Sequence, residues 1–325
     1  MLLPTRLCAV LLLAGIGPLA AEEYHFRRAV DIRMACHPRP DLGAPAGIRI
    51  SLGAKIWVTR QTQVNGVTWY NDGLHARNPA PLCWVYGPAT VELDGEPPET
   101  GWLAMLDHIL ARSDAKFAEY VAVDNALLDV ESPADRKAID DSGRIQFRRL
   151  QMIERMLEGE DAHRNAVERD PLKKAWILAH RELVHDDEPG GRWLLSDKPY
   201  LALLARYKGE AWAEEIAWAY TELARGGDEC DAECALETIV EQPLWYLSRY
   251  PAGAHAGAAM KRAAELAALA AGMACSDSLP PDWDTPVKHD VAEKIRDGLR
   301  EIELPGKQHI LRDLDAAERK CAKAR

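Results

Sequence analysis

The segment AHRELVHDDEPGG, residues 179–191, holds the residue types of a zinc-protease helix: two histidines and a glutamate. In such a helix the histidines are four residues apart, so that both imidazoles face one ion. His180 and His185 are five residues apart. The sequence therefore predicts no metal centre here, and we interpret the acidic run 186–188 as a solvated helix end before a glycine pair.

The chain contains no sequence motif of a familiar catalytic site. A GxSxG nucleophile elbow, a GxxxxGK[ST] phosphate loop and a GxGxxG dinucleotide loop are all absent from the sequence. Acidic residues are abundant, but no spacing marks an acid and a base that share an apolar pocket, as general acid–base catalysis requires. We therefore expect no catalytic residues, no cofactor and no enzymatic activity.

The first residues have the layout of a secretory signal peptide. Arg6 precedes an apolar run over residues 7–16, and the small residues Ala20 and Ala21 follow. The run is too short to span a bilayer, and no later segment is long and apolar enough to do so. We predict cleavage after residue 21 and a periplasmic or secreted protein without a transmembrane segment.

The net charge of the chain argues against negatively charged partners. The formal net charge of −11 becomes −12 when Arg6 leaves with the signal peptide. Such an acidic chain is unsuited to bind nucleic acid or an anionic lipid surface.

Cleavage would leave an even number of cysteines. Loss of Cys8 reduces the seven cysteines to six, namely Cys36, Cys83, Cys230, Cys234, Cys275 and Cys321. An even number in an exported chain favours disulfides, although six cysteines allow 15 connectivities. Cys230 and Cys234 are four residues apart, which favours a local disulfide. The alternatives are a half metal site with His255, although zinc knuckles usually have C-x2-C spacing, or free thiols.

The chain divides into two halves with different periodicity. Residues 24–95 alternate with period two between turn signals, including Asn65-Gly66, and predict about five short strands in a small barrel. Residues 96–101 are acidic and contain Gly and Pro, as in a linker. From 102 to 325 the apolar positions recur every three to four residues, which predicts roughly eight or nine helices, with a kink at Pro243. The predicted fold class is α+β with two domains.

The first half resembles a bacterial SH3-like domain, a small barrel common in exported envelope proteins. The resemblance is carried by VDIR (30–33), LGAK (52–55), Trp69-Tyr70 and Trp84-Val85. It implies that Gly87-Pro88 forms a short helical turn before the last strand. Cys36 then follows the first strand and Cys83 begins the fourth, so that a disulfide between them would join two loops.

The remaining pair, Cys275 and Cys321, would link the Ala-rich helix to the terminal helix. We assign this third disulfide by elimination, after Cys36–Cys83 and Cys230–Cys234.

Aromatic residues of the first half allow two interpretations. Trp69 and Trp84 are predicted to face the core. Trp57, Tyr70 and Tyr86 could instead form an exposed ligand-binding surface that stacks on a peptide or a glycan, because SH3-type domains use aromatic-lined grooves.

The second half is similar, more distantly, to the helix pairs of tetratricopeptide-like periplasmic proteins. Tyr250-Pro251 followed by an Ala-rich helix fits that local pattern, although no clean 34-residue period is present. The combined resemblance implies a non-enzymatic binding or scaffold protein whose partner is an envelope protein or a peptidoglycan peptide. The alternatives are a cell-wall hydrolase with an SH3-like targeting module, or a secreted inhibitor or immunity-type protein.

Overall fold

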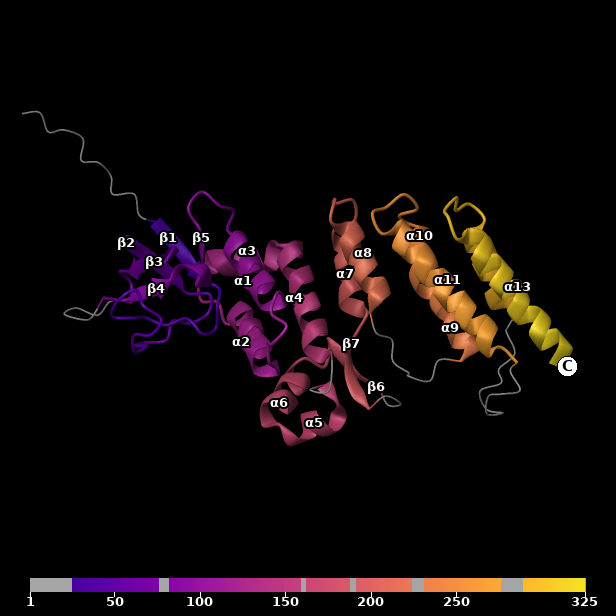
Figure 1. Ribbon diagram of the computed structural model, residues 1–325, viewed down its shortest axis with the longest axis horizontal. Coiled ribbons are helices and arrows are strands. Elements are labelled where there is room, and N and C mark those ends of the chain that lie inside the picture. The colour runs from indigo at the N-terminus through magenta and orange to yellow at the C-terminus, as the bar shows by residue number, and fades with distance from the viewer. Residues whose placement is uncertain are drawn as a thin grey trace, which may run out of the picture.

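The computed structural model describes residues 25–75, 82–158, 162–187, 191–223, 231–275 and 289–324. Over these ranges the chain is mixed α/β, with a five-stranded antiparallel sheet followed by a long row of helices (Figure 1). The predicted signal peptide at 1–21 lies outside the described residues. Among the helices that the structure describes, none is long and apolar enough to cross a membrane.

The sheet contains all five strands of the N-terminal half. They are β1 (His25–Ala29), β2 (Lys55–Val64), β3 (Val67–Asp72), β4 (Trp84–Tyr86) and β5 (Thr90–Glu92). Their order is β4-β3-β2-β1-β5, with every pair antiparallel. Asn65 and Gly66 join β2 to β3 with φ of 52° and 78°, the positive values that a two-residue hairpin turn needs. The short helical turn expected at Gly87-Pro88 is confirmed as the 3₁₀ helix η1 (Gly87–Ala89).

A disulfide closes the small core of the sheet. Cys36 and Cys83 are bonded, as the sequence predicted, with their Cα atoms 4.6 Å apart. Both cysteines are buried among Ile50, Ile56 and Val85. The bond therefore fixes the long loop after β1 to the start of β4. Trp69 and Trp84 are also buried, at 3% and 9% exposure, as predicted.

The sheet is joined to the helices by the buried side chain of Arg28. Its guanidinium donates to the Gly53 carbonyl at 2.9 Å and to Asp135 Oδ1 at 2.7 Å, and it lies 4.0 Å from the centre of the Trp102 ring. Trp102 Nε1 donates to the same Asp135 oxygen at 3.3 Å. At Gly53, φ is +77°, a conformation that favours glycine, and a Cβ atom would lie 2.8 Å from Trp102. Both the backbone conformation and the close packing therefore require glycine at this position.

Helix α1 begins inside the segment that was interpreted as a linker. It spans Thr100–Leu110, so the last two residues of the 96–101 segment are helical. Gly101 is buried, and a Cβ atom there would lie 2.6 Å from Arg28 Nε. The close approach places Trp102 directly on the sheet.

Eight helices and a hairpin form the first part of the helical half. The helices are α1, α2 (Phe117–Leu128), α3 (Pro133–Asp141), α4 (Gly143–Leu157), α5 (Arg164–Arg169), α6 (Pro171–Ala179), α7 (Lys198–Arg206) and α8 (Ala213–Glu222), and the hairpin is β6 (Val184–Asp187) and β7 (Arg192–Leu195). They share one core rich in large side chains, which also includes Val30 beside the sheet. α4 packs between α1 and α7, so the helices follow one another along the row (Figure 1).

The β6–β7 hairpin corrects two predictions. The half from 102 to 325 is not wholly helical, and the run 186–188 is not a helix end, because Asp186 and Asp187 lie in β6. Glu188 lies outside the described residues. The glycine pair was interpreted as a helix stop, but Gly191, with φ of +62°, precedes β7. A glycine turn ends a helix or reverses a strand equally well, so local sequence did not distinguish the two.

The last part of the chain packs around small side chains. It contains α9 (Ala232–Ile239), the π-turn η3 (Val240–Leu244), α10 (Trp245–Leu247), α11 (Ala256–Met273), α12 (His289–Leu299) and α13 (Lys307–Ala324). The kink expected at Pro243 is this π-turn. The structure thus divides the half into more helices than the eight or nine predicted. The Cys275–Cys321 disulfide is confirmed and links the end of α11 to α13.

The Arg28 contact predicts a large effect of Asp135. We expect Asp135→Ala to lower the free energy of unfolding by about 3–5 kcal/mol, because it leaves a buried guanidinium without its counterion. Denaturant unfolding followed by tryptophan fluorescence measures this. Asp140→Ala is the matched control, since Asp140 is exposed on the same helix and should change stability by less than about 0.5 kcal/mol. Equal effects of the two variants would contradict the structural role of Arg28.

The two disulfides stabilise different cores, which hydrogen exchange can separate. Replacement of Cys36 and Cys83 together by alanine should destabilise the sheet by about 2–4 kcal/mol. Amide protection should fall in β1–β5 and stay unchanged in α11 and α13. The reverse pattern is expected for alanine at Cys275 and Cys321. A uniform loss of protection in both double variants would show that the cores unfold as one unit.

Candidate functional site

A groove in the sheet is the first candidate binding site. It is a cavity of about 360 Å³, lined by residues of β1, β2, β3 and the β5 end, among them Phe26, Tyr70 and Glu92. The Arg27 guanidinium lies 4.3 Å from the centre of the Tyr70 ring. Arg27 also donates to Thr90 Oγ1 at 2.7 Å and to Glu92 at 3.3 Å. The wall of the groove is thus a preorganised pair of an aromatic ring and a cation.

At the rim of the same groove, some polar side chains are hydrogen-bonded within the protein and others have no partner in the described ranges. Asp94 accepts from His25 Nδ1 at 3.0 Å and from the Phe26 backbone N–H at 3.1 Å. Arg60 and Gln61 are exposed on β2, and within the described ranges neither side chain has an ion pair or a hydrogen bond. Arg60 is therefore a cation available to a carboxylate from outside the chain.

The structure separates two of the three predicted ligand-binding aromatics, Tyr70 and Tyr86. Tyr70 lines the groove. Tyr86 pairs with Trp69 across β3 and β4, with the two ring centres 5.5 Å apart. Because neighbouring residues of a strand point to opposite faces, Tyr86 lies on the other face from Tyr70. Trp57 pairs with Phe26 and packs beside Gly73, where a Cβ atom would lie 2.9 Å from its ring.

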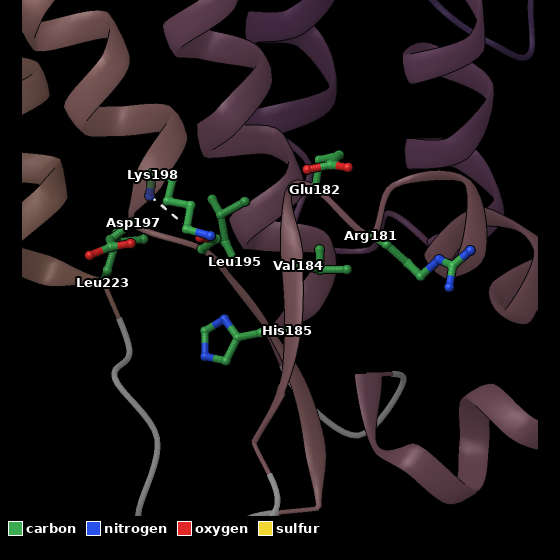
Figure 2. Close-up of a pocket in the computed structure, with 9 residues that line it drawn as sticks. Arg181, Glu182, Val184, His185, Leu195, Asp197, Lys198 and Leu223 are labelled. Carbon is green, nitrogen blue, oxygen red and sulfur yellow. Dashed lines mark hydrogen bonds between the residues drawn. The ribbon is translucent and has the colours of Figure 1, made fainter.

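A second cavity lies beside the β6–β7 hairpin and measures about 480 Å³. Figure 2 shows His185, Asp197 and Lys198 on one side of β6, while Arg181 is directed to the other side. Asp197 and Lys198 stand at the start of α7, and His185 projects from the strand. Val184, Leu195 and Leu223 supply the buried apolar part of the lining.

A half-buried carboxyl group, that of Glu154, lies in a smaller neighbouring cavity of about 130 Å³, which shares Leu195 and Leu223 with the hairpin cavity. Glu154 of α4 accepts from the hydroxyl of the buried Tyr200 at 3.1 Å. Burial raises the pKa of Glu154 to about 7, the Tyr200 hydrogen bond opposes the shift, and the charges of Glu158 and Glu222 add to it. Such a group holds and releases a proton near neutral pH, which makes it the side chain here best suited to proton transfer.

His180, by contrast, is part of a saturated buried cluster. Its Nε2 lies 3.0 Å from Asp124 Oδ2 and its Nδ1 lies 2.8 Å from the Trp176 carbonyl oxygen, so both ring nitrogens face acceptors. Arg149 Nε donates to Asp124 at 2.6 Å. Burial alone would raise the pKa of Asp124, but hydrogen bonds from His180, Arg149 and Trp176 lower it to about 2. The cluster holds α2, α4 and α6 together and leaves no nitrogen of His180 free for chemistry.

Of Cys230 and Cys234, for which the sequence predicted a local disulfide, only Cys234 lies within the described residues. Cys234 is disulfide-bonded, and Cys230 lies outside the described residues, as does their predicted bond. The sulfur of Cys234 is therefore not available as a thiolate ligand. His255 Nε2 lies 3.1 Å from Glu215, and its ring stacks on Trp218 with the centres 5.0 Å apart. Within the described residues, Cys234 is thus in a disulfide and His255 lies within hydrogen-bonding distance of Glu215, in place of the half metal site considered from the sequence.

Sequence reasoning missed Glu154, Tyr200 and the hairpin cavity. Glu154 and Tyr200 are 46 residues apart on different helices, and no local spacing relates them. The signal in the sequence was the segment 179–191, which was examined for metal binding and contributes four residues, Arg181, Glu182, Val184 and His185, to the wall of the cavity.

The raised pKa of Glu154 makes stability depend on pH. The folded protein binds the proton more tightly than the unfolded chain, so stability falls as pH rises from about 4.5 to about 7 and stays lower above that. We expect Glu154→Gln to be more stable than the parent above pH 7, by about 1–3 kcal/mol, and equal to it near pH 4. Urea unfolding at pH 4 and pH 8 measures this. The exposed Glu237→Gln serves as control, and an identical pH profile for all three proteins would refute the burial of the charge.

No protein-family model, curated protein or solved structure matches this chain. The resemblances to SH3-like and tetratricopeptide-like proteins therefore stay predictions from the sequence. Function has to be inferred from the contacts and charges of the side chains described above.

Proposed function

We propose that this chain is a non-enzymatic binding protein of the bacterial envelope, periplasmic or secreted, which recognises a peptide that carries a free carboxylate. The proposed partners are peptidoglycan stem peptides and envelope proteins. The sheet groove supplies the recognition site, and the helical array holds the sheet and offers further protein-binding surface.

The observation that carries this proposal is the contact of Arg27 with Tyr70 beside Arg60, which has no partner among the described residues. An aromatic ring whose position is fixed by a cation offers an extended peptide a rigid contact at low entropic cost. The nearby exposed guanidinium adds a donor for a carboxylate, in the planar geometry that suits it. Hydrogen bonds from Arg27 to Thr90 and Glu92 hold the wall in place before a ligand arrives.

Location outside the cytoplasm is supported by the disulfides. The Cys36–Cys83 and Cys275–Cys321 bonds are of the kind that persist in oxidising compartments. The leader-like sequence at residues 1–21 agrees with that location.

The fold supports the same class of protein. A 3₁₀ turn between two short strands is what the SH3-like resemblance implied, and such domains bind peptides in grooves. The row of sequentially packed helices agrees with a helical-repeat array, whose extended faces serve as protein-binding surfaces.

Binding of soluble peptidoglycan fragments to the full-length chain tests the proposal. We expect saturable binding by isothermal titration calorimetry, weakened about tenfold or more by Arg60→Glu, because the reversed charge repels the carboxylate. Arg49→Glu is the matched control, since Arg49 is exposed on the same N-terminal half, outside the groove, and should bind like the parent.

Three outcomes would overturn the proposal. These are no binding of fragments or of envelope peptides, equal loss in both arginine variants, and release of new soluble fragments during incubation. The last would indicate the cell-wall hydrolase that the sequence left as the alternative.

A further inference from the structure

A largely apolar pocket lies beside the Cys36–Cys83 disulfide, apart from the sheet groove. It measures about 250 Å³, and its wall includes both cysteines, Ile48 and Leu82. Ile48 is 43% exposed and Leu82 is 45% exposed, so the wall presents apolar surface to solvent. No residue of this wall lines the sheet groove. Large apolar side chains that are exposed together are typical of binding surfaces.

One polar residue of the wall, His37, is almost fully buried and fixed in place. It is 8% exposed, and its Nδ1 donates to the Ala44 carbonyl at 3.3 Å. Its ring packs edge-on against Trp69, with the ring centres 5.5 Å apart. The position of this imidazole is therefore set by the protein before any ligand arrives.

A second histidine of the wall, His75, is oriented by a buried carboxylate. Its Nδ1 donates to Asp72, which is 0% exposed and also accepts from the backbone N–H groups of Trp57 at 3.2 Å and Leu74 at 2.9 Å. Because Nδ1 carries the proton, neutral His75 presents the lone pair of Nε2 as an acceptor. Among the described residues, the Nε2 atoms of His37 and His75 have no hydrogen-bond partner.

The composition of the pocket suits one aromatic ring with a hydroxyl group. The sulfur atoms of the disulfide are polarizable, and sulfur contacts aromatic rings favourably. A volume of about 250 Å³ is below the range of drug-sized sites, which favours a small ligand. A purely apolar ring would leave the histidine acceptors without a donor, and a charged ligand would lose its hydration against Ile48 and Leu82.

We propose that this pocket binds a phenol. The hydroxyl group donates to His75 Nε2, and the ring lies against the disulfide, Ile48 and Leu82. A free phenolic compound and the tyrosine side chain of a partner offer the same chemistry, and the experiment below separates these two sources. The site does not depend on the function proposed for the sheet groove.

Titration of the full-length protein at pH 8 tests the proposal. The probes are p-cresol and 4-methylanisole, in which a methyl group replaces the hydroxyl hydrogen, and chemical-shift changes or calorimetry report binding. We expect saturable binding of p-cresol and about tenfold or more weaker binding of 4-methylanisole, because the hydrogen bond to His75 is lost. A capped Ala-Tyr-Ala peptide then identifies the source: tighter binding than p-cresol indicates a partner's tyrosine, and weaker binding indicates a free phenol.

A histidine variant assigns the acceptor. His75→Phe keeps a ring but removes the nitrogen, so it should bind p-cresol about tenfold more weakly and no longer distinguish it from 4-methylanisole. His309→Phe is the control, because His309 is exposed in the helical half and does not line the pocket.

A leucine variant tests the apolar wall without touching the histidines. Leu82→Ser should weaken both aromatic probes alike, by about threefold or more, because apolar contact area is lost. Leu42→Ser is the matched control, since Leu42 is 62% exposed in the same half of the chain and does not line the pocket.

Any of four results overturns the proposal. These are no saturable binding of p-cresol at millimolar concentration, equal binding of 4-methylanisole, unchanged selectivity in His75→Phe, and equal effects of the two leucine variants. Circular dichroism of each variant checks that the fold is kept. Arg60→Glu should leave p-cresol binding intact, because Arg60 lines only the sheet groove among the cavities described here.

Discussion

The arrangement of the two halves depends on one buried guanidinium. Arg28 is 3% exposed, and burial lowers its pKa while Asp135 opposes that shift. A charge in that position is tolerated only because a carboxylate, a backbone carbonyl and an indole face all surround it. Those partners come from α3, from the loop before β2 and from α1. The sheet is consequently held on the helical array by a polar contact, and not by a merged apolar core alone.

The helical array itself changes character along its length. The core of α1–α8 is filled by large side chains, whereas alanine is the commonest residue in the core of α9–α13. Alanine lets helices approach closely but buries little apolar area per residue. The Cys275–Cys321 bond joins α11 to α13 in that part of the molecule. A second disulfide, Cys36–Cys83, lies in the small core of the sheet. Each of these disulfides thus adds a covalent link to one of the two cores that lie outside α1–α8.

Two histidines five residues apart show how tertiary context decides function. His180 has both nitrogens occupied within a buried cluster around Asp124, so it contributes structure. His185 lies on β6, exposed in the same cavity as the exposed side chains of Asp197 and Lys198. Two arginines of the sheet differ in the same way. Arg27 donates hydrogen bonds to Thr90 and Glu92, whereas Arg60 on the neighbouring strand has no side-chain partner among the described residues.

Local sequence was enough to predict the strands, the Asn65-Gly66 turn, the break at Pro243 and the burial of Trp69 and Trp84, because each depends on near neighbours in the chain. The pairing of Cys36 with Cys83 came from the SH3-like resemblance, because six cysteines by themselves allow 15 connectivities. The β6–β7 hairpin was misread, since its glycines suit a helix end as well as a turn. Only the tertiary structure decided which charges meet. The Arg28–Asp135 contact and the Glu154–Tyr200 hydrogen bond depend on side chains from elements far apart in the chain, and the distances between them are set by packing and not by spacing along the chain.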